Sequence, residues 1–465
     1  MSPKFPAEFR SGVIVAGAGV SGIGVANLLA GIGVEVLVAD DSDAGRARAE
    51  DAGHRAVSTA DARGYFGEVG AVVTSPGWRP DSPLLVSASS AQLPVLGDVE
   101  ACYRLDRAGV FGAPRQWLVV TGTNGKTTTT GMLAAMMQQL GADTGKRASA
   151  CGNIGVAVAD ALTAPQRVDV LVAELSSFQL FWSDQLTPDA GVLLNLADDH
   201  LDWHGSFAHY AAAKARVLTA AHAVAGVDDE RVRELAARTG RGDIIGFTLS
   251  EPGPGQVGVS GGRLVANLGG APRDLASAEG IEPAGAAGVL DALAASAVAL
   301  TQGAEPRHIQ AALGAYRVEG HRGTVVHSSG GVDWVDNSKA TNPHAADSAL
   351  TGAGTVVWIA GGQLKGAAVE ELVAAHAGQF RAVALLGVDR GVLQGAVEKL
   401  APDVPLFVSD STDPERAMAE VVDFAASQAQ PGDTVLLAPA AASLDMFPGM
   451  SARGNAFAAA AMRHS

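Results

Sequence analysis

The stretch TGTNGKTTTT, residues 121–130, brings together residue types that bind phosphate. It follows the apolar run WLVV and precedes a segment with helical spacing, so its glycines fall in a turn between a strand and a helix. Backbone N–H groups in such a turn, and at the start of the helix, can surround phosphate oxygens. Lys126 would add a positive charge, and the Thr127 hydroxyl could bind Mg²⁺. The two glycines lie two residues closer together than in the common GxxxxGK[ST] motif.

A second glycine turn, GAGVSG, lies near the start of the chain, with Asp40 about twenty residues further on. Glycines at 17, 19 and 22 followed by an acidic residue match the fingerprint of a dinucleotide site. This pattern alone is weak support for NAD. An NAD-dependent dehydrogenase is therefore an alternative, but it would leave the phosphate turn at 121–130 without a role.

Three further polar side chains follow apolar runs or lie in a helical segment, and the pattern around them supports a role in a phosphate site to different degrees. Glu174 ends the apolar run VLVAE, and the carboxyl end of a parallel strand opens into a ligand crevice, where an acidic residue can hold Mg²⁺. His200 follows the apolar run GVLLNL, although a lone histidine is more often structural than a ligand. Lys214 lies in the helical segment YAAAK and is by itself typical of a surface lysine.

The spacing of apolar runs predicts an α/β protein of three domains. A chain of 465 residues, 48% of them hydrophobic, exceeds the size of one core. Strands alternate with helices throughout, which predicts open, mostly parallel sheets with flanking helices. We place a Rossmann-like domain at 1–110, a P-loop-like ATPase domain at 111–317 and a second Rossmann-like domain at 318–465. The Gly- and Pro-rich stretch 240–285 predicts short strands and loops on the central domain.

Charge and composition argue against several classes of protein. The formal net charge is −16 and basic residues form no block, so we expect no nucleic-acid partner. The two cysteines, Cys102 and Cys151, lack metal-site spacing and cannot form a disulfide framework. No apolar run has the length of a signal segment or a membrane span. We therefore expect a cytoplasmic monomer without a membrane span.

Several blocks, in order along nearly the whole chain, resemble the Mur ligase family. The blocks are GTNGKTTTT (122–130), GNIG (152–155), ELSSFQL (174–180), LNLADDHLDWHGS (194–206), YAAAK (210–214), VDNSKATN (335–342), SLDMF (443–447) and RGNAF (453–457). SKATN and ELSSFQL are the most specific, since sister ligases that add other amino acids carry different sequences there. The resemblance implies an ATP-dependent ligase that adds D-glutamate to UDP-N-acetylmuramoyl-L-alanine through an acyl phosphate, in the synthesis of peptidoglycan precursors.

The resemblance also implies roles for individual residues. The catalytic set is Lys126, Glu174, His200 and Lys214, with Lys214 carbamylated by CO₂ and two Mg²⁺ ions held by Thr127, Glu174, His200 and Lys214. ATP is bound by Gly122, Thr123, Asn124, Gly125, Lys126, Thr127, Thr128, Arg322, Asp336 and Asn337. The UDP-substrate is bound by Ser21, Asp40, Asp41, Ser75, Gly77, Asn153, Ser176 and Gln179. D-Glutamate is bound by Lys339, Thr341, Lys365, Ser443, Leu444 and Met450.

Three positions depart from the family pattern. Asn337 stands where many relatives have an aspartate that binds the ATP ribose, although Asp336 is adjacent and could substitute. The segment around Asp291 replaces a His-Asn…Asn pattern, so adenine contacts there are not predicted. Met450 occupies a position often filled by phenylalanine, which would soften that side of the amino-acid pocket.

Other functions remain open from the sequence. Within the family, the runner-up is a sister ligase for another amino acid, or a folate-type polyglutamate ligase; the SKATN block and the UDP-binding domain oppose both. A P-loop ATPase with a regulatory role is a different class. That ATPase would hydrolyse ATP without any amino acid, whereas the ligase would release phosphate only when both co-substrates are present.

Overall fold

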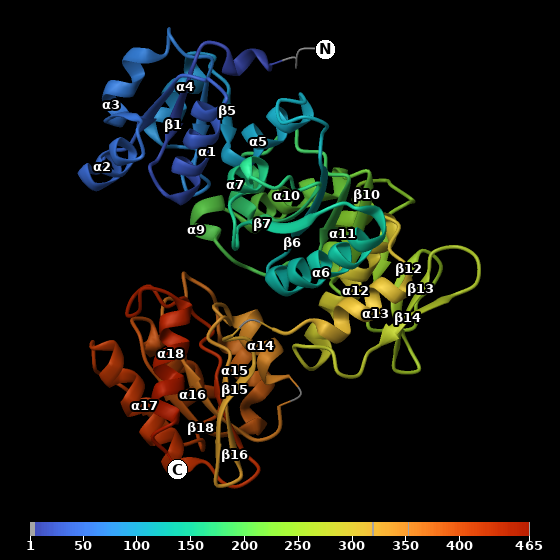
Figure 1. The fold of residues 1–465 in the computed structure, drawn as a ribbon. Helices are drawn as coiled ribbons and strands as arrows, with labels where there is room; N and C mark the ends of the chain where they lie inside the picture. Colours follow the sequence, from blue (N-terminus) through green and yellow to red (C-terminus); the bar gives the residue numbers. More distant parts are fainter. Residues whose placement is uncertain (1–4, 319, 352, 465) are drawn as a thin grey trace. The chain divides into compact units, whose positions relative to one another are not determined.

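The computed structural model describes residues 5–318, 320–351 and 353–464 and contains three open sheets (Figure 1). It divides into two compact units. The first unit comprises the chain up to Leu196 together with Ala208–Ile281 and Val289–Tyr316, and the second comprises Ala197–Phe207, Glu282–Gly288 and the chain from Arg317. Each sheet is wholly or mostly parallel and has flanking helices, so the predicted α/β class with three sheets is confirmed.

The first sheet has five parallel strands in the order β3-β2-β1-β4-β5. Its strands are β1 (Val13–Ala16), β2 (Val36–Ala39), β3 (Arg55–Val57), β4 (Ala71–Thr74) and β5 (Val95–Gly97). Its helices are α1 (Val20–Gly31), α2 (Asp43–Asp51), α3 (Thr59–Ala62), α4 (Pro83–Ser90) and α5 (Asp98–Arg107). The central strands β1 and β4 are buried along their whole length, as expected of a parallel sheet covered by helices.

The central sheet has nine strands in the order β14-β13-β12-β11-β10-β9-β6-β8-β7. Its strands are β6 (Gln116–Thr121), β7 (Ala148–Gly152), β8 (Val170–Glu174), β9 (Ala190–Leu193), β10 (His222–Gly226), β11 (Ile245–Phe247), β12 (Gln256–Ser260), β13 (Arg263–Asn267) and β14 (Arg273–Ser277). Its helices are α6 (Lys126–Thr144), α7 (Val158–Thr163), α8 (Ser177–Phe181), α10 (Phe207–Ala215), α11 (Glu230–Arg238), α12 (Ala286–Thr301) and α13 (Pro306–Ala315). The stretch 240–285 thus forms short strands that continue this sheet at one edge, the last two antiparallel.

The third sheet has six strands in the order β15-β16-β20-β17-β18-β19. Its strands are β15 (Thr324–Ser329), β16 (Val332–Asp336), β17 (Val356–Ala360), β18 (Phe380–Leu385), β19 (Leu406–Val408) and β20 (Thr434–Leu437). The helices of the second unit are α9 (Leu201–His204), α14 (Pro343–Leu350), α15 (Glu370–His376), α16 (Arg390–Leu400), α17 (Pro414–Gln428) and α18 (Met450–Ala461).

Strand β17, VVWIA, shows why the third sheet is covered on both faces. Side chains alternate along a strand, and here both sets are apolar. Trp358 belongs to the core that includes α14, α15 and α16, whereas Val357 and Ile359 belong to the core that includes α17 and α18. Within residues 5–318, 320–351 and 353–464, no helix combines the length and apolar character that a membrane crossing needs.

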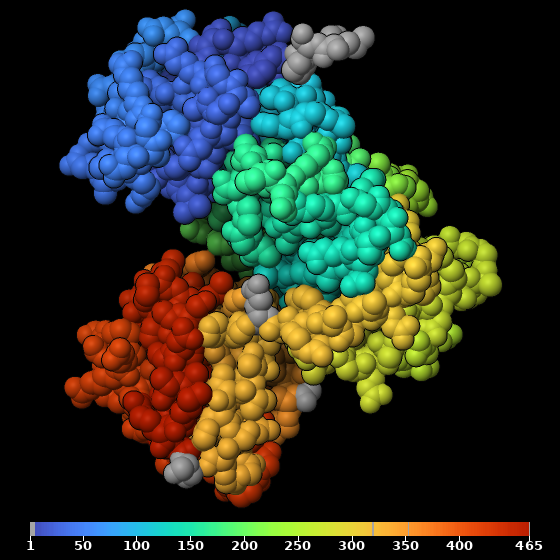
Figure 2. Space-filling model, viewed as in Figure 1, coloured from blue at the N-terminus to red at the C-terminus, as the bar shows by residue number. Residues whose placement is uncertain are grey.

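The segment between the first and central sheets, residues 108–115, is held by arginines on both sides. Arg107 donates to the Arg115 carbonyl, and Arg167 donates to the carbonyls of Phe111 and Ala113. In the space-filling view, the cyan segment that contains α5 adjoins both the blue first sheet and the green central sheet (Figure 2). A Gly- and Pro-containing linker is therefore fixed by carbonyl contacts along its length.

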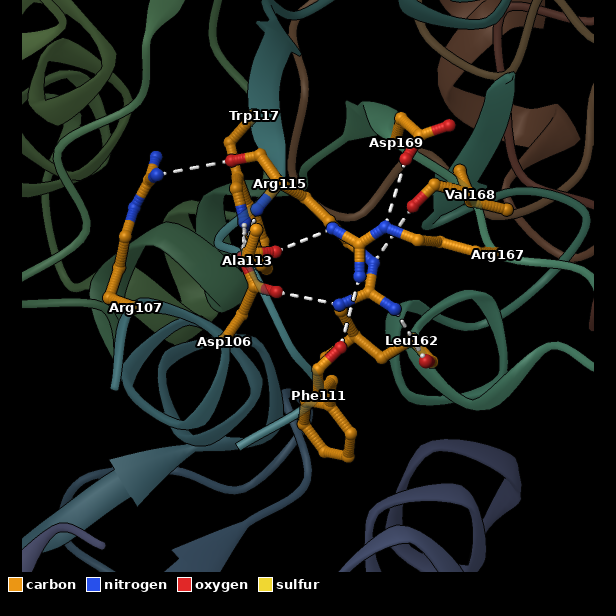
Figure 3. Close-up of polar contacts among 10 residues, drawn as sticks. All are labelled: Asp106, Arg107, Phe111, Ala113, Arg115, Trp117, Leu162, Arg167, Val168 and Asp169. Atoms are coloured by element: carbon orange, nitrogen blue, oxygen red, sulfur yellow. Dashed lines mark hydrogen bonds and ion pairs between the residues drawn. The ribbon is translucent and has the colours of Figure 1, made fainter. Parts of the chain in front are cut away.

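A buried ion pair lies at the centre of this junction (Figure 3). Arg115 Nη1 donates to Asp106 Oδ1 at 2.7 Å, and the two side chains are 3% and 0% exposed. Asp106 Oδ2 also accepts from the Arg115 N–H and from Trp117 Nε1. The other guanidinium nitrogens donate to the carbonyls of Val168 and Leu162. Both charges are compensated by short hydrogen bonds, which is the condition under which a buried pair is tolerated.

Replacing Arg115 by alanine should lower the free energy of unfolding by about 3–5 kcal/mol, because it leaves the Asp106 carboxylate buried without its cation. Urea unfolding followed by circular dichroism measures the effect. Arg307→Ala is the matched control: that side chain is 63% exposed in its ion pair, so its removal should have a much smaller effect. Equal, small losses for both variants would show that the buried pair does not stabilise the junction.

Candidate active site

Four neighbouring strands of the central sheet, β9, β6, β8 and β7, end at the same edge, where Lys126 follows β6 and Glu174 ends β8. In the parallel register, Val120 of β6 lies beside Glu174 of β8, and Glu174 lies beside Gly152 of β7. On the other side of β6, Thr121 lies beside Leu193 of β9. The phosphate turn, Glu174 and the segment after β7 therefore meet at the carboxyl edge of the sheet, where α/β proteins bind ligands.

The phosphate turn connects β6 to α6 as predicted. Gly125 has φ 80°, a left-handed conformation that favours glycine, and α6 begins at Lys126. A side chain on Gly125 would also run into the carboxylate of Asp291 from α12. Asp291 Oδ1 in turn accepts from the Thr129 hydroxyl at 3.0 Å, so this carboxylate contacts the turn itself. The first N–H groups of a 19-residue helix thus point out of the turn and can bind an anion.

The turn is held in place by its neighbours. Asn195 accepts from the Asn124 N–H at 2.8 Å and donates to the Asn124 carbonyl at 3.1 Å. Lys126 Nζ donates to the carbonyls of Gly122 at 3.0 Å and Thr123 at 2.8 Å. The ammonium group is therefore kept at the turn, where it can contact phosphate. Asn195 was not among the predicted residues, although it lies within the LNLADDH block that carries the resemblance.

Glu174 is the predicted metal ligand, and its surroundings suit a cation. The residue is 1% exposed, and Oε2 is buried with no hydrogen-bond partner among the described residues. Since an unpartnered buried carboxylate oxygen is costly, this oxygen fits a bound Mg²⁺. The described part of the chain holds no group of three or more His, Cys, Asp or Glu residues placed to bind a metal. A magnesium ion here would therefore rely on phosphate oxygens, water and the Thr127 hydroxyl, as is usual for Mg²⁺.

Lys214 is buried, and its sequence context alone, typical of a surface lysine, was misleading. The residue is 2% exposed, and Nζ donates to the Gly122 carbonyl at 2.7 Å. Its ammonium lies 5.0 Å from the centre of the Tyr210 ring, one turn earlier on α10. The Tyr210 hydroxyl is 2.8 Å from Thr123 Oγ1. The spacing of Tyr210 and Lys214 in YAAAK already indicated a shared helix face, but it did not show that this face covers the phosphate turn.

His200 and the segment around it belong to the second unit. His200 immediately precedes α9 and has a left-handed backbone, φ 53°. Its Nε2 lies 3.5 Å from Asp199 Oδ2. The predicted metal set is thus divided between the two units, with Thr127, Glu174 and Lys214 in the first.

Five of the residues predicted to bind the UDP-substrate follow strands of the first sheet: Ser21, Asp40, Asp41, Ser75 and Gly77. Asp40 Oδ2 accepts from the Ala18 N–H, and Oδ1 accepts from both the N–H and the hydroxyl of Ser42. Burial would raise the pKa of Asp40, but these hydrogen bonds and the Arg48 charge outweigh it and lower the pKa. Asp40 therefore holds the glycine turn in shape, and its predicted contact with the UDP-substrate stays a prediction.

The other predicted substrate residues in the first unit differ in whether their side chains already form hydrogen bonds within the protein. Asp41 accepts from the N–H and hydroxyl of Thr59. Ser75 Oγ is buried and has no partner among the described residues, so it is available to a ligand; Gly77 lies two residues beyond it. Ser176 and Gln179 form a capping box at the start of α8, each side chain accepting from the other's backbone N–H.

Asp98, at the start of α5, is a buried carboxyl beside the predicted site that sequence analysis missed. Burial raises the pKa of Asp98 to about 6, although hydrogen bonds from the N–H groups of Val99 and Asp98 and from the Ser21 side chain oppose the shift. Its Oδ1 has no partner among the described residues. The contact with Ser21 places this carboxyl next to a residue predicted to bind the UDP-substrate.

The residues predicted to bind D-glutamate gather at the carboxyl ends of β16, β20 and β17, which are neighbours in the third sheet. Lys339 and Thr341 follow β16, Lys365 follows β17, Ser443 and Leu444 follow β20, and Met450 begins α18. Leu444 is 70% exposed and Met450 40% exposed, so apolar surface is available beside the two lysines. The loops after β17 and β20 are joined by paired hydrogen bonds between Gln363 and Ala442.

Arg453 of α18 ties these loops together and was not predicted, although RGNAF was among the resembling blocks. It is 1% exposed, and it donates to the hydroxyl and carbonyl of Ser338 and to the carbonyls of Gly361 and Ala441. Burial lowers the pKa of Arg453 to about 10, with the charges of Asp445 and Asp336 opposing. The buried Arg453 guanidinium therefore forms hydrogen bonds to all three loops that follow β16, β17 and β20.

The predicted ATP contacts of the second unit surround Asp336. This residue is 1% exposed; Oδ2 lies 2.6 Å from His321 Nδ1, and Oδ1 accepts from the Ser338 N–H. Asn337 is only partly buried, so it is better placed than Asp336 to contact a ribose. Arg322 has a buried Nε without a partner among the described residues, which suits an arginine that binds an anion.

Family models match both units. The Mur ligase middle domain matches residues 120–254, and the Mur ligase, glutamate ligase domain matches residues 321–441. The UDP-N-acetylmuramoylalanine–D-glutamate ligase of Corynebacterium efficiens is 57% identical over 460 residues, covering 99% of this chain and 96% of the relative. This chain belongs to the Mur ligase family. The family predicted from the motifs is therefore confirmed, while the roles of individual residues stay predictions.

Other relatives agree with this assignment. The ligase of the same name from Corynebacterium diphtheriae is 56% identical, covering 98% of this Mur ligase and 97% of the relative. Among solved structures, the UDP-N-acetylmuramate–alanine ligase of Thermotoga maritima matches with a TM-score of 0.57 and 16% identity, covering 98% of this chain and all of that one. At such low identity, the structural match supports the fold alone.

The pKa of Asp98 predicts how stability should depend on pH. The folded value of about 6 exceeds the ordinary value of 3.8, so ionising this carboxyl costs more in the folded chain. Below about pH 4 the carboxyl is protonated in both the folded and the unfolded chain, so ionisation does not lower the free energy of unfolding. Above about pH 6 the carboxyl is ionised in both, and the full cost applies. The gain in unfolding free energy from Asp98→Asn should therefore be about 2 kcal/mol larger at pH 7.5 than at pH 4.5.

Urea unfolding of wild type and Asp98→Asn at the two pH values measures this difference. Asp81→Asn, which removes an exposed carboxyl in the same domain, is the control and should show no such trend. A gain from Asp98→Asn that is the same at both pH values would mean that Asp98 ionises in the folded chain as easily as in water.

Proposed function

We propose that this Mur ligase joins D-glutamate to UDP-N-acetylmuramoyl-L-alanine, converting ATP to ADP and phosphate, in the cytoplasmic synthesis of peptidoglycan precursors. The observation that carries the proposal is similarity at 57% and 56% identity, over nearly the whole chain, to ligases named for that substrate and amino acid. The phosphate turn beside a buried, partly unpartnered Glu174 supplies the chemistry that such a ligase needs.

The nucleotide phosphates would bind at the phosphate turn. Backbone N–H groups at the start of α6 and the Lys126 ammonium offset the charge of the phosphates. Glu174 and Thr127 would hold Mg²⁺, which when bound neutralises phosphate oxygens and lowers their repulsion of an incoming anion. Arg322, whose Nε has no partner among the described residues, is proposed to be a further ATP contact.

Lys214 is proposed to carry a carbamate, formed when its neutral amine adds to CO₂ and releases a proton. A buried ammonium is disfavoured by desolvation, and the amine lies against the base of the phosphate turn. A carbamate there would be an anionic ligand for a second Mg²⁺, together with His200. The proposal thus assigns one ion to Glu174 and one to Lys214.

The uridine diphosphate part of the substrate would bind at the edge of the first sheet. Asp40 holds the turn between β1 and α1 through the Ala18 N–H, and the Ser75 hydroxyl has no partner among the described residues. Asn153, Ser176 and Gln179, on the segments after β7 and β8, are proposed to contact the rest of that substrate.

D-Glutamate would bind in the third domain. Lys339 and Lys365 offer cations for its two carboxylates, and Thr341 and Ser443 offer hydroxyl donors. Leu444 and Met450 offer apolar surface for its methylene groups. Arg453 would keep these groups in place by bonding the loops that carry them.

The reaction takes place in two displacements. A carboxylate oxygen of the alanyl substrate bonds to the γ-phosphorus as the bond from phosphorus to the ADP oxygen breaks, giving an acyl phosphate and ADP. The D-glutamate ammonium loses one proton to water, and the resulting amine bonds to the acyl carbon. The nitrogen of the tetrahedral intermediate then loses a second proton, and the bond from carbon to the phosphate oxygen breaks, which releases phosphate and leaves the amide. Lys126 contacts the phosphoryl oxygens and stabilises negative charge in both steps.

The proposal is tested by phosphate release with ATP, UDP-N-acetylmuramoyl-L-alanine and D-glutamate, each omitted in turn. Steady release should require all three, and L-alanine or L-lysine should not replace D-glutamate. Because Lys214 needs CO₂, a bicarbonate-depleted buffer should lower the rate. Release that continues without an amino acid would instead indicate a regulatory ATPase, and preference for another amino acid would indicate a sister ligase.

A further inference from the structure

The two oxygens of the Glu174 carboxylate have different surroundings. Oε1 accepts a hydrogen bond from Asn153 Nδ2 at 2.9 Å. Oε2 is buried and has no partner among the described residues. One oxygen is therefore fixed by the protein, and the other remains for a cation.

The hydrogen bond determines how the Asn153 carboxamide must lie. An ionised carboxylate only accepts hydrogen bonds, so the amide nitrogen has to face Glu174 and the amide oxygen has to face away. Asn153 is exposed as a residue, whereas Glu174 is 1% exposed. The carboxamide thus connects a buried carboxylate to the surface at which substrate would bind.

The backbone secures the same pair. The Asn153 N–H donates to the Glu174 carbonyl at 2.8 Å, so the residues are joined through both main chain and side chain. Gly152 permits this approach: its φ is 104°, and a side chain there would run into the Glu174 carbonyl oxygen. A residue whose only task was to form a turn would bond within its own segment, yet Asn153 bonds a residue 21 positions away.

We propose that Asn153 is a positioning residue for Glu174: its amide nitrogen holds Oε1 so that Oε2 faces the magnesium–nucleotide complex. This inference rests on the proposed function, because it takes Mg²⁺ to be the cation that Glu174 binds. Groups that orient a metal ligand in this way set metal affinity without touching the metal. Asn153 would then serve two purposes, since its oxygen remains available for the substrate contact predicted from the sequence.

The test is binding of Mn²⁺, as a probe for Mg²⁺, to the full-length protein with ADP, measured by electron paramagnetic resonance. Asn153→Ala should weaken Mn²⁺ binding roughly 10-fold or more. Affinity for ADP without metal should stay within about twofold of wild type, because the turn at 122–128 is unchanged. Asn455→Ala, the same change at an exposed position on α18, is the control. It should leave Mn²⁺ affinity unaltered, which would show that the effect of Asn153→Ala is specific to that position.

A double-mutant cycle separates positioning from other roles. If Asn153 acts through Glu174, Asn153→Ala should have no further effect on Mn²⁺ affinity once Glu174→Ala is present. The inference is overturned if Asn153→Ala leaves Mn²⁺ affinity within twofold of wild type, or if its effect is equally large in both backgrounds. A wild type that binds Mn²⁺ in this way but releases no phosphate with D-glutamate would contradict the proposed function and leave this inference standing.

Discussion

Repulsion between anions is the constraint on which the proposed site depends. A carboxylate has to approach a triphosphate in a chain whose own formal charge is −16, so any attraction has to come from local groups. At the edge of the central sheet these groups would be the first N–H groups of α6, Lys126 and the Mg²⁺ that Glu174 is proposed to bind. Parallel strands that end in register bring them together, which explains why the catalytic chemistry is placed on the sheet edge rather than on a separate loop.

Several buried charges in this chain are held by hydrogen bonds that fix geometry. Asp106 and Arg115 fix the segment between the first two sheets, and Arg453 fixes three loops of the third. Glu174 differs from these three residues: Oε1 accepts from Asn153, whereas Oε2 has no partner among the described residues. A fully satisfied carboxylate would be a structural element, whereas a half-satisfied one is suited to a ligand.

Much of the fold could be predicted from the sequence. Apolar runs such as WLVVTG and VLVAEL marked strands, and the glycine turns after them marked the ligand edge, because both signals are local. The two antiparallel strand pairs in 256–277, β12 with β13 and β13 with β14, were less evident. The local sequence pattern does not specify which strands pair at the edge of a sheet. The family assignment followed from blocks of residues rather than from periodicity.

The candidate site was only partly predictable, and the missing parts depend on long-range contacts. Lys214 had the pattern of a surface lysine because its burial comes from the phosphate turn, about ninety positions earlier. The engagement of Asp40 with its own turn, and of Asn153 with Glu174, likewise requires knowing which strands are neighbours. Sequence motifs identified these residues, but the structure was needed to show which groups each side chain contacts.

If phosphoryl transfer activates the substrate carboxylate, one carboxylate oxygen must leave with the phosphate. The measurement is a reaction of ATP and D-glutamate with UDP-N-acetylmuramoyl-L-alanine whose two carboxylate oxygens are ¹⁸O. We expect the released phosphate to carry one ¹⁸O atom per molecule and the new amide to keep the other. Amide product formed with unlabelled phosphate would show that no acyl phosphate forms.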